Sequence, residues 1–247
     1  MRQIIALPSP SRHALDDALI LLRLAIAYAG LAAVSHWGAG QIMQRLGHHL
    51  HIDTQFLVLD ALFTGLLMLG SLGVAWLLQQ RDPLLWLTGR GFSPAGLIPA
   101  LLLAVVMVVS ANPLAAWLDV RLPAPDLLPE NAALPRALTP LLELQNWRLL
   151  GALGVAVLWV PLAEEVIFRG WLFKALQRTR PGIWIALPAS TLIFAMLHSF
   201  YSTGGVVVIA LLGAGLGWLR WKYDQLWLCV VAHALYNGLT LLLVALN

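Results

Sequence analysis

Two adjacent carboxylates and an arginine interrupt an apolar stretch of this sequence, VPLAEEVIFRGWLF, at residues 160–173. Glu165 and Arg169 are four residues apart, so on a helix they share one face and can form an ion pair. Glu164 points about 100° away from that face, which leaves its carboxylate free to act on another group. A carboxylate surrounded by hydrocarbon is costly, and for that reason it is a candidate functional residue.

Two further polar patterns follow in later apolar stretches. FAMLHSF places His198 four residues after Phe194, and HALYNG places His233 and Asn237 four residues apart on one helical face. Counted in helical rise from the expected helix ends, Glu164 and His198 lie at similar depths, and His233 lies somewhat shallower. We therefore expect Glu164, the two histidines and Asn237 to converge in one cavity.

A glutamate, two histidines and an asparagine in a dry cavity are suited to hydrolysis of a peptide bond. A carboxylate kept basic by burial can take a proton from water, and a histidine can position that water. The second histidine and the asparagine amide can donate hydrogen bonds to the oxyanion that forms. Among the other histidines, the cluster GHHLHID at residues 47–53 has no partner motif and is interpreted as a solvated loop.

The same side chains leave a metal site open as an alternative. Zinc binds histidine nitrogens and carboxylates, so Glu164, His198 and His233 would be its ligands. The adjacent zinc motif His-Glu-x-x-His is absent from the sequence, and a metal site would have to be assembled from separate helices. The asparagine pairs more naturally with an oxyanion, so no cofactor is favoured.

The elements that must position these residues are membrane helices. Of the 247 residues, 60% are hydrophobic and 11% charged, whereas a soluble domain is about a quarter charged. The net charge of +3 does not indicate a nucleic-acid partner, and the single Cys229 excludes an internal disulfide. We predict an all-α, polytopic transmembrane helical bundle of about seven spans, at 17–37, 57–78, 96–118, 149–168, 183–203, 205–221 and 226–245.

We predict one membrane domain over 1–247. It comprises N-terminal spans of unassigned role at 1–118, a Pro-rich loop at 119–147 and the motif-bearing helices at 148–247. The first span is expected to be retained, because Arg23 interrupts its apolar run and no cleavage boundary follows. Lys and Arg are more numerous in the segments that an N-in, C-out orientation places inside. The glycines at 213 and 217 are interpreted as a helix-packing face.

Taken in order, the three motifs resemble the CAAX-protease and bacteriocin-processing family, the Abi-type intramembrane proteases that include the Ras-converting CAAX endopeptidases. The resemblance rests on Glu-Glu-x-x-x-Arg at 164–169, Phe-x-x-x-His at 194–198 and His-x-x-x-Asn at 233–237, with Gly170 after the arginine. It covers about 149–247, the last hundred residues.

The resemblance implies a membrane-embedded catalytic cavity in which Glu164 is the general base with His198 beside it. It implies an oxyanion-stabilising role for His233 and Asn237, and makes Glu165 and Arg169 support for the first glutamate. The substrate would be a membrane-associated peptide or protein, such as a prenylated C-terminus, a leader peptide or a sorting tail. The expected location is the bacterial inner (cytoplasmic) membrane, which the chain would cross several times.

Two other functions stay open at this point. A proton-coupled transporter also uses buried Glu and His chains, but the first three spans carry few such groups and no repeat is seen. A non-catalytic immunity or scaffold protein would share the fold without needing Glu164 or His198.

Overall fold

The computed structural model describes residues 12–46, 52–79, 89, 93–122, 147–179 and 181–246, and in these ranges the chain is helical without a named strand. The helices before the motif region are α1 (Arg12–Leu46), α2 (Ile52–Gln79), the short 3₁₀ helix η2 (Pro94–Gly96) and α4 (Leu97–Arg121). The later ones are α6 (Trp147–Leu153), α7 (Val160–Glu165), α8 (Phe173–Gln177), α9 (Ile183–Met196), α10 (Thr203–Tyr223) and α11 (Leu226–Leu246). The all-α class is therefore confirmed.

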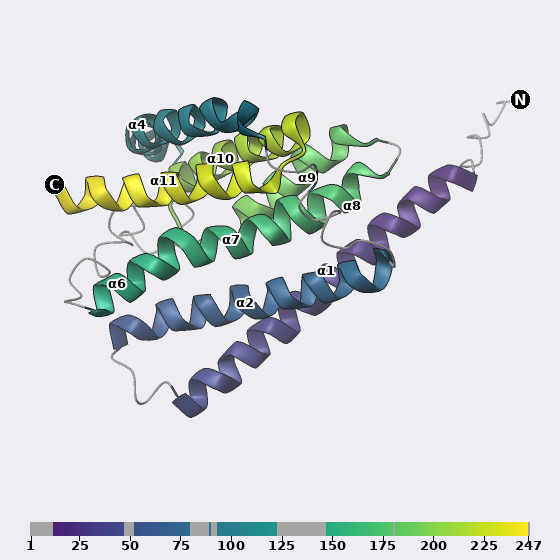
Figure 1. The fold of residues 1–247 in the computed structure, drawn as a ribbon, viewed down its shortest axis with the longest axis horizontal. Coiled ribbons are helices and arrows are strands. Elements are labelled where there is room, and N and C mark those ends of the chain that lie inside the picture. The colour runs from purple at the N-terminus through teal and green to yellow at the C-terminus, as the bar shows by residue number, and fades with distance from the viewer. Residues whose placement is uncertain are drawn as a thin grey trace, which may run out of the picture.

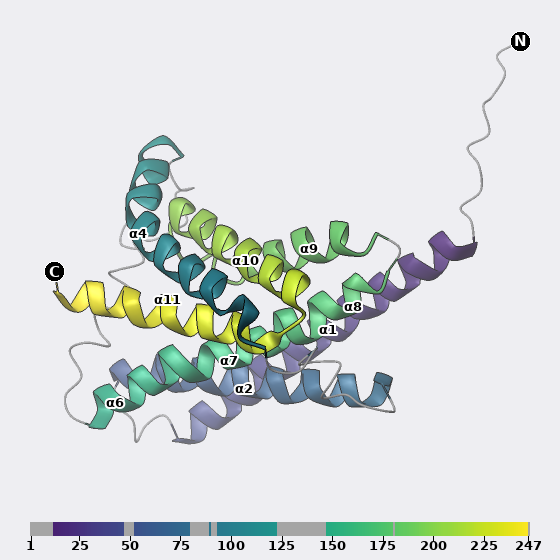
Figure 2. The same ribbon diagram turned by 45° about the horizontal axis from the view of Figure 1, so that its top comes forward.

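The helices α6, α7 and α8 form one continuous rod, because π-helical segments join them: η3 (Gly154–Trp159) and η4 (Val166–Leu172). In Figures 1 and 2 this rod runs between two groups of helices. The helices α1 and α2 pack together on one side of it, and α4, α9, α10 and α11 lie on the other. The rod thus contacts both groups of helices, and side chains from both groups can meet along it.

Four helices in the described part of the chain are long and apolar enough to cross a membrane: Pro94–Arg121, Leu149–Gln177, Thr203–Tyr223 and Leu226–Leu246. Val58–Gly73 and Ile183–Met196 are shorter apolar helices. These helices are those of an integral membrane protein, while the count of seven spans and the N-in orientation stay predictions. The expected loop cluster at residues 47–53 lies mostly outside the described residues.

Several helix boundaries differ from those expected from the sequence, beginning with α1, which extends to Leu46 rather than to residue 37. The fourth span does not end at 168 but continues to Gln177, because its charged residues are paired inside the fold rather than exposed at a membrane surface. The helix that was expected to run to 203 ends at Met196 and is followed by turns, so His198 lies just beyond it. α4 extends to Arg121, so 119–121 are helical, and 123–146 lie outside the described residues.

Glycines allow α10 to approach α4 and α9 closely, and a hydrogen bond from a carboxylate holds its first turn. A Cβ on Gly204 would meet the backbone of Ala115 in α4, and one on Gly213 would lie 3.1 Å from the Phe194 ring in α9. A Cβ on Gly217 would lie 2.6 Å from Leu187, so both glycines of the predicted packing face do lie at a helix contact. Asp119 Oδ1 accepts a 2.6 Å hydrogen bond from Gly204 N at the start of α10.

Candidate active site

The rod carries the two glutamates at the end of α7, with a π turn on either side. In η3 the Val160 N–H donates to the carbonyl of Val155, five residues earlier. The next donor in that pattern would be Pro161, which has no N–H. The carbonyl of Ala156 is therefore open to another partner, and Asn237 Nδ2 from α11 donates to it at 2.9 Å. π turns in α-helices are frequent at functional sites.

Glu165 forms the most buried charge cluster of the site. Its Oε1 accepts from Arg169 Nη1 at 2.9 Å, with both side chains fully buried, which confirms the ion pair expected from their spacing. Arg169 Nη2 also donates to the carbonyl of Gly213 at 3.0 Å, and the guanidinium lies 4.5 Å from the centre of the Phe194 ring. The cation is thus held by α7, α9 and α10 together.

Glu165 has a second partner, which the sequence did not indicate. Its Oε1 lies 2.9 Å from Nδ1 of His233, 68 residues away on α11. A carboxylate accepts only, so Nδ1 carries the proton and donates it. The Glu165–Arg169 pair therefore fixes the ring orientation of His233, while its expected support of Glu164 stays a prediction.

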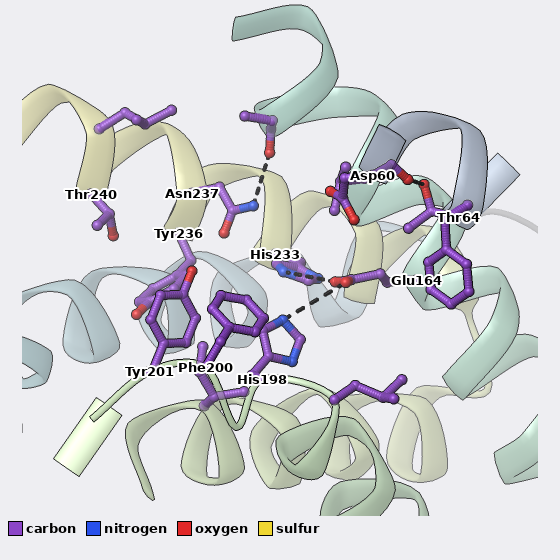
Figure 3. Close-up of a pocket in the computed structure, with 16 residues that line it drawn as sticks. Asp60, Thr64, Glu164, His198, Phe200, Tyr201, His233, Tyr236, Asn237 and Thr240 are labelled. Atoms are coloured by element: carbon purple, nitrogen blue, oxygen red, sulfur yellow. Dashed lines mark hydrogen bonds and ion pairs between the residues drawn. The ribbon is translucent and has the colours of Figure 1, made fainter. Parts of the chain in front are cut away.

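Glu164 lies between the two histidines (Figure 3). Its Oε1 is 3.8 Å from His198 Nε2 and its Oε2 is 3.7 Å from His233 Nε2. Both separations exceed a direct hydrogen bond. The Glu164 side chain is 13% exposed and that of His198 16%, so this carboxylate reaches solvent-accessible space that Glu165 does not.

The two imidazoles both direct their Nε2 atom toward Glu164. His198 Nδ1 lies 2.8 Å from the carbonyl of Phe194, and because a carbonyl accepts only, this nitrogen also donates. In the neutral ring, Nε2 is then an unprotonated acceptor for both histidines. Aromatic rings fix His198 further: Tyr201 stacks on it with centroids 6.0 Å apart and an interplanar angle of 13°.

All four predicted residues, Glu164, His198, His233 and Asn237, line one cavity of about 260 Å³. Its walls come from α2, the rod, the turn after α9, α10 and α11. Glu165 and Arg169 lie behind the wall. Convergence of the motifs in one cavity, as the sequence predicted, is therefore confirmed, while the chemical role of each residue stays a prediction.

Asp60 of α2 and Tyr201 after α9 are among the lining residues that were not singled out from the sequence. Asp60 had a signal, because it is the only charged residue between Asp53 and Arg81. By the argument applied to Glu164, a carboxylate in such a stretch is a candidate functional residue. Tyr201 gave no signal, since an aromatic residue near the end of an apolar stretch is ordinary.

The donor set fits zinc in type but not in spacing. Two imidazole nitrogens and a carboxylate are zinc ligands, and metal-bound histidines usually donate their other N–H to a carboxylate or carbonyl, as both do here. Tetrahedral zinc would bring these nitrogen and oxygen atoms to about 3.3 Å from one another, closer than the observed 3.7 and 3.8 Å. Within the described residues no group of three or more such side chains is arranged to hold a metal ion.

Comparison with known proteins bears on the rod and the helices after it. A family model described as type II CAAX prenyl endopeptidase Rce1-like matches residues 146–239. The matched region contains Glu164, His198, His233 and Asn237, and it does not include α1, α2 or α4. Neither the curated proteins nor the solved structures contain a match. The family match confirms the resemblance that the three motifs predicted.

Proposed function

We propose that this protein, whose residues 146–239 are Rce1-like, is an intramembrane endopeptidase that hydrolyses a peptide bond with a glutamate-activated water. Rce1-like proteins are a protease family, and this supports peptidase activity in the chain. The observation that carries the proposal is the placement of Glu164 between two histidine Nε2 atoms at the wall of a cavity among membrane-capable helices.

The first step is activation of water. A water molecule held by Glu164 and His198 donates one hydrogen to the carboxylate and the other to the unprotonated Nε2 of the imidazole. Its lone pair then faces a substrate carbonyl in the cavity. As the oxygen attacks the carbonyl carbon, Glu164 takes the proton, and it returns the proton to the leaving amine when the C–N bond breaks.

The second requirement is a donor for the oxyanion. His233 Nδ1 donates to the Glu165 carboxylate, and Nε2 can donate to the oxyanion when it also carries a proton. Asn237 uses one of its two amide hydrogens on Ala156 and keeps the other. A preorganised donor of this kind contributes a few kcal/mol of transition-state stabilisation.

The test is cleavage of membrane peptides by purified protein, with a farnesylated C-terminal peptide and an apolar single-span peptide as probes. Glu164→Gln removes the base with little change in volume and should abolish cleavage while thermal unfolding stays unchanged. His198→Gln should also lose activity. His36→Gln, on the exposed α1 position His36, is the matched control and should cleave like wild type.

A zinc chelator distinguishes the two chemistries that these side chains allow. Loss of cleavage in Glu164→Gln with no effect of the chelator supports the metal-independent mechanism. Loss with chelator, restored by zinc, would make Glu164, His198 and His233 metal ligands. Full activity of Glu164→Gln refutes the mechanism, and it would leave the transporter and scaffold functions as the remaining alternatives.

A further inference from the structure

A third carboxylate, which the mechanism does not use, lines the active-site cavity. Asp60 extends from α2, and Figure 3 shows it in the same cavity as Glu164 and His198. The Rce1-like match begins at residue 146, so it does not cover Asp60. The Thr64 hydroxyl donates a 2.8 Å hydrogen bond to the main-chain carbonyl of Asp60, and the Asp60 carboxylate interacts electrostatically with Glu164 and His198.

The position of Asp60 is fixed by contacts between α2 and the rod. The indole of Trp159 donates to the carbonyl of Ala61 at 3.1 Å, one residue from Asp60. The same indole packs on Gly65, where a Cβ would lie 3.0 Å from its ring. Because Trp159 belongs to η3, this contact sets the register of α2 against the segment that carries Glu164.

Asp60 differs from Glu165 in being an acidic side chain that is open to the cavity. Glu165 is fully buried and needs Arg169 as its partner, whereas Asp60 is exposed and reaches the open space of the cavity. Among the described residues that line this cavity, two are carboxylates, two are imidazoles and none is Lys or Arg. The nearest buried cation, Arg169, is already engaged by Glu165 and Gly213.

This charge arrangement has a consequence for the substrate. A cavity with apolar walls strengthens the interaction between charges inside it, because the surroundings screen them weakly. Two carboxylates in a lining that holds no Lys or Arg attract a positive group and repel a negative one. Glu164 must stay free to activate water, so Asp60 is the carboxylate that can pair with a substrate cation.

We propose that Asp60 is a specificity-determining residue that selects substrates with a positively charged side chain next to the scissile bond and disfavours acidic ones. The inference deepens the proposed protease function and rests on it, since the selected group is part of the peptide that the same cavity cleaves. The competing explanation is that Asp60 holds a proton and only fills space, in which case its charge has no effect on substrate choice.

The experiment compares apolar twelve-residue peptides that are identical except for one Lys, Gln or Glu, moved position by position along the chain. Wild type should show a kcat/KM for the best Lys peptide about tenfold or more above that for the matching Glu peptide. Asp60→Asn should bring this ratio close to one. Asp60→Glu keeps the charge and should keep a preference for Lys.

Thr64→Val is the matched control, because Thr64 lines the same cavity one turn away and the substitution leaves the charge unchanged. It should keep the ratio of wild type. Asp60→Ser replaces Asp60→Asn if the latter fails to give a folded protein by thermal unfolding. An equal ratio in wild type and in the charge-removing variant overturns the proposal.

A binding measurement separates this inference from the proposed function. Fluorescent versions of the same peptides are titrated onto Glu164→Gln protein and onto the double variant with Asp60→Asn. Suppose that wild type cleaves no peptide, while Glu164→Gln protein binds the Lys peptide more tightly than the Glu peptide and the double variant does not. Selection by Asp60 then holds, and the proposed protease function fails. If the peptides are cleaved without a charge preference, the selection by Asp60 is refuted and the protease function stands. If there is no cleavage and no charge preference in binding, both proposals are refuted.

Discussion

The Glu165–Arg169 pair predicts a large loss of stability when its cation is removed. In Arg169→Met the apolar stem is kept, while Glu165 is left as a buried charge whose remaining partner among the described residues is the imidazole of His233. Removing one partner of a buried pair costs about 3–5 kcal/mol. The carbonyl of Gly213 also loses its donor. We expect a decrease of at least ~3 kcal/mol in the free energy of unfolding.

The double variant Glu165→Gln/Arg169→Met tests whether this loss comes from the unpaired charge. Gln removes the charge of Glu165 and can still accept from His233 Nδ1, so the double variant should be more stable than Arg169→Met alone. Independent sites add to within about 0.5 kcal/mol. A coupling of ~2 kcal/mol or more between the two substitutions is therefore the expected result.

The assay is unfolding of the purified protein by SDS in mixed micelles, followed by fluorescence of its 11 tryptophans. A double-mutant cycle from the four proteins gives the coupling energy. Two results would refute the reasoning: a free energy of unfolding in Arg169→Met equal to that of wild type, or strictly additive losses. Either would mean that the pair is not a buried, mutually dependent unit.

Two other predictions concern the histidine and the helix packing. Glu165→Gln alone should lower kcat by up to the factor of about 10²–10³ that one oxyanion donor contributes, because His233 loses its charged acceptor. KM should stay nearly constant, and an unchanged kcat would remove Glu165 from the positioning of His233. Gly204→Ala should cost about 1–3 kcal/mol because its Cβ would meet the backbone of Ala115. Gly151→Ala, where a Cβ meets nothing within 4 Å, is its control and should be neutral or stabilising in the same SDS titration; equal effects of the two would contradict the close α4–α10 approach.

The sequence predicted those parts of the site that depend on spacing within one helix. The pairing of Glu165 with Arg169 follows from a separation of four residues, and the structure has it. The separation of Glu164 from that pair follows from the same geometry. These predictions succeed because the positions of neighbours on a helix are set by its backbone and need no knowledge of tertiary structure.

The parts that the sequence did not predict depend on contacts between distant helices. The bond from His233 to Glu165 joins residues 68 positions apart, and spacing says nothing about it. The place of Asp60 depends on how α2 docks on the rod through Trp159. The π turns were missed because a single widened turn leaves the apolar composition of a span unchanged.

Pro161 has a consequence for the order in which such a bundle is assembled. Helices of a membrane protein insert first and associate afterwards, and a carbonyl without a donor is costly in hydrocarbon. Because Pro161 cannot donate to Ala156, the inserted rod carries one unfilled acceptor until α11 arrives with Asn237. A slip of α11 by one turn, about 5.4 Å, would leave that acceptor empty. Asn237 thereby selects one alignment of α11, and with it the depth at which His233 meets both glutamates.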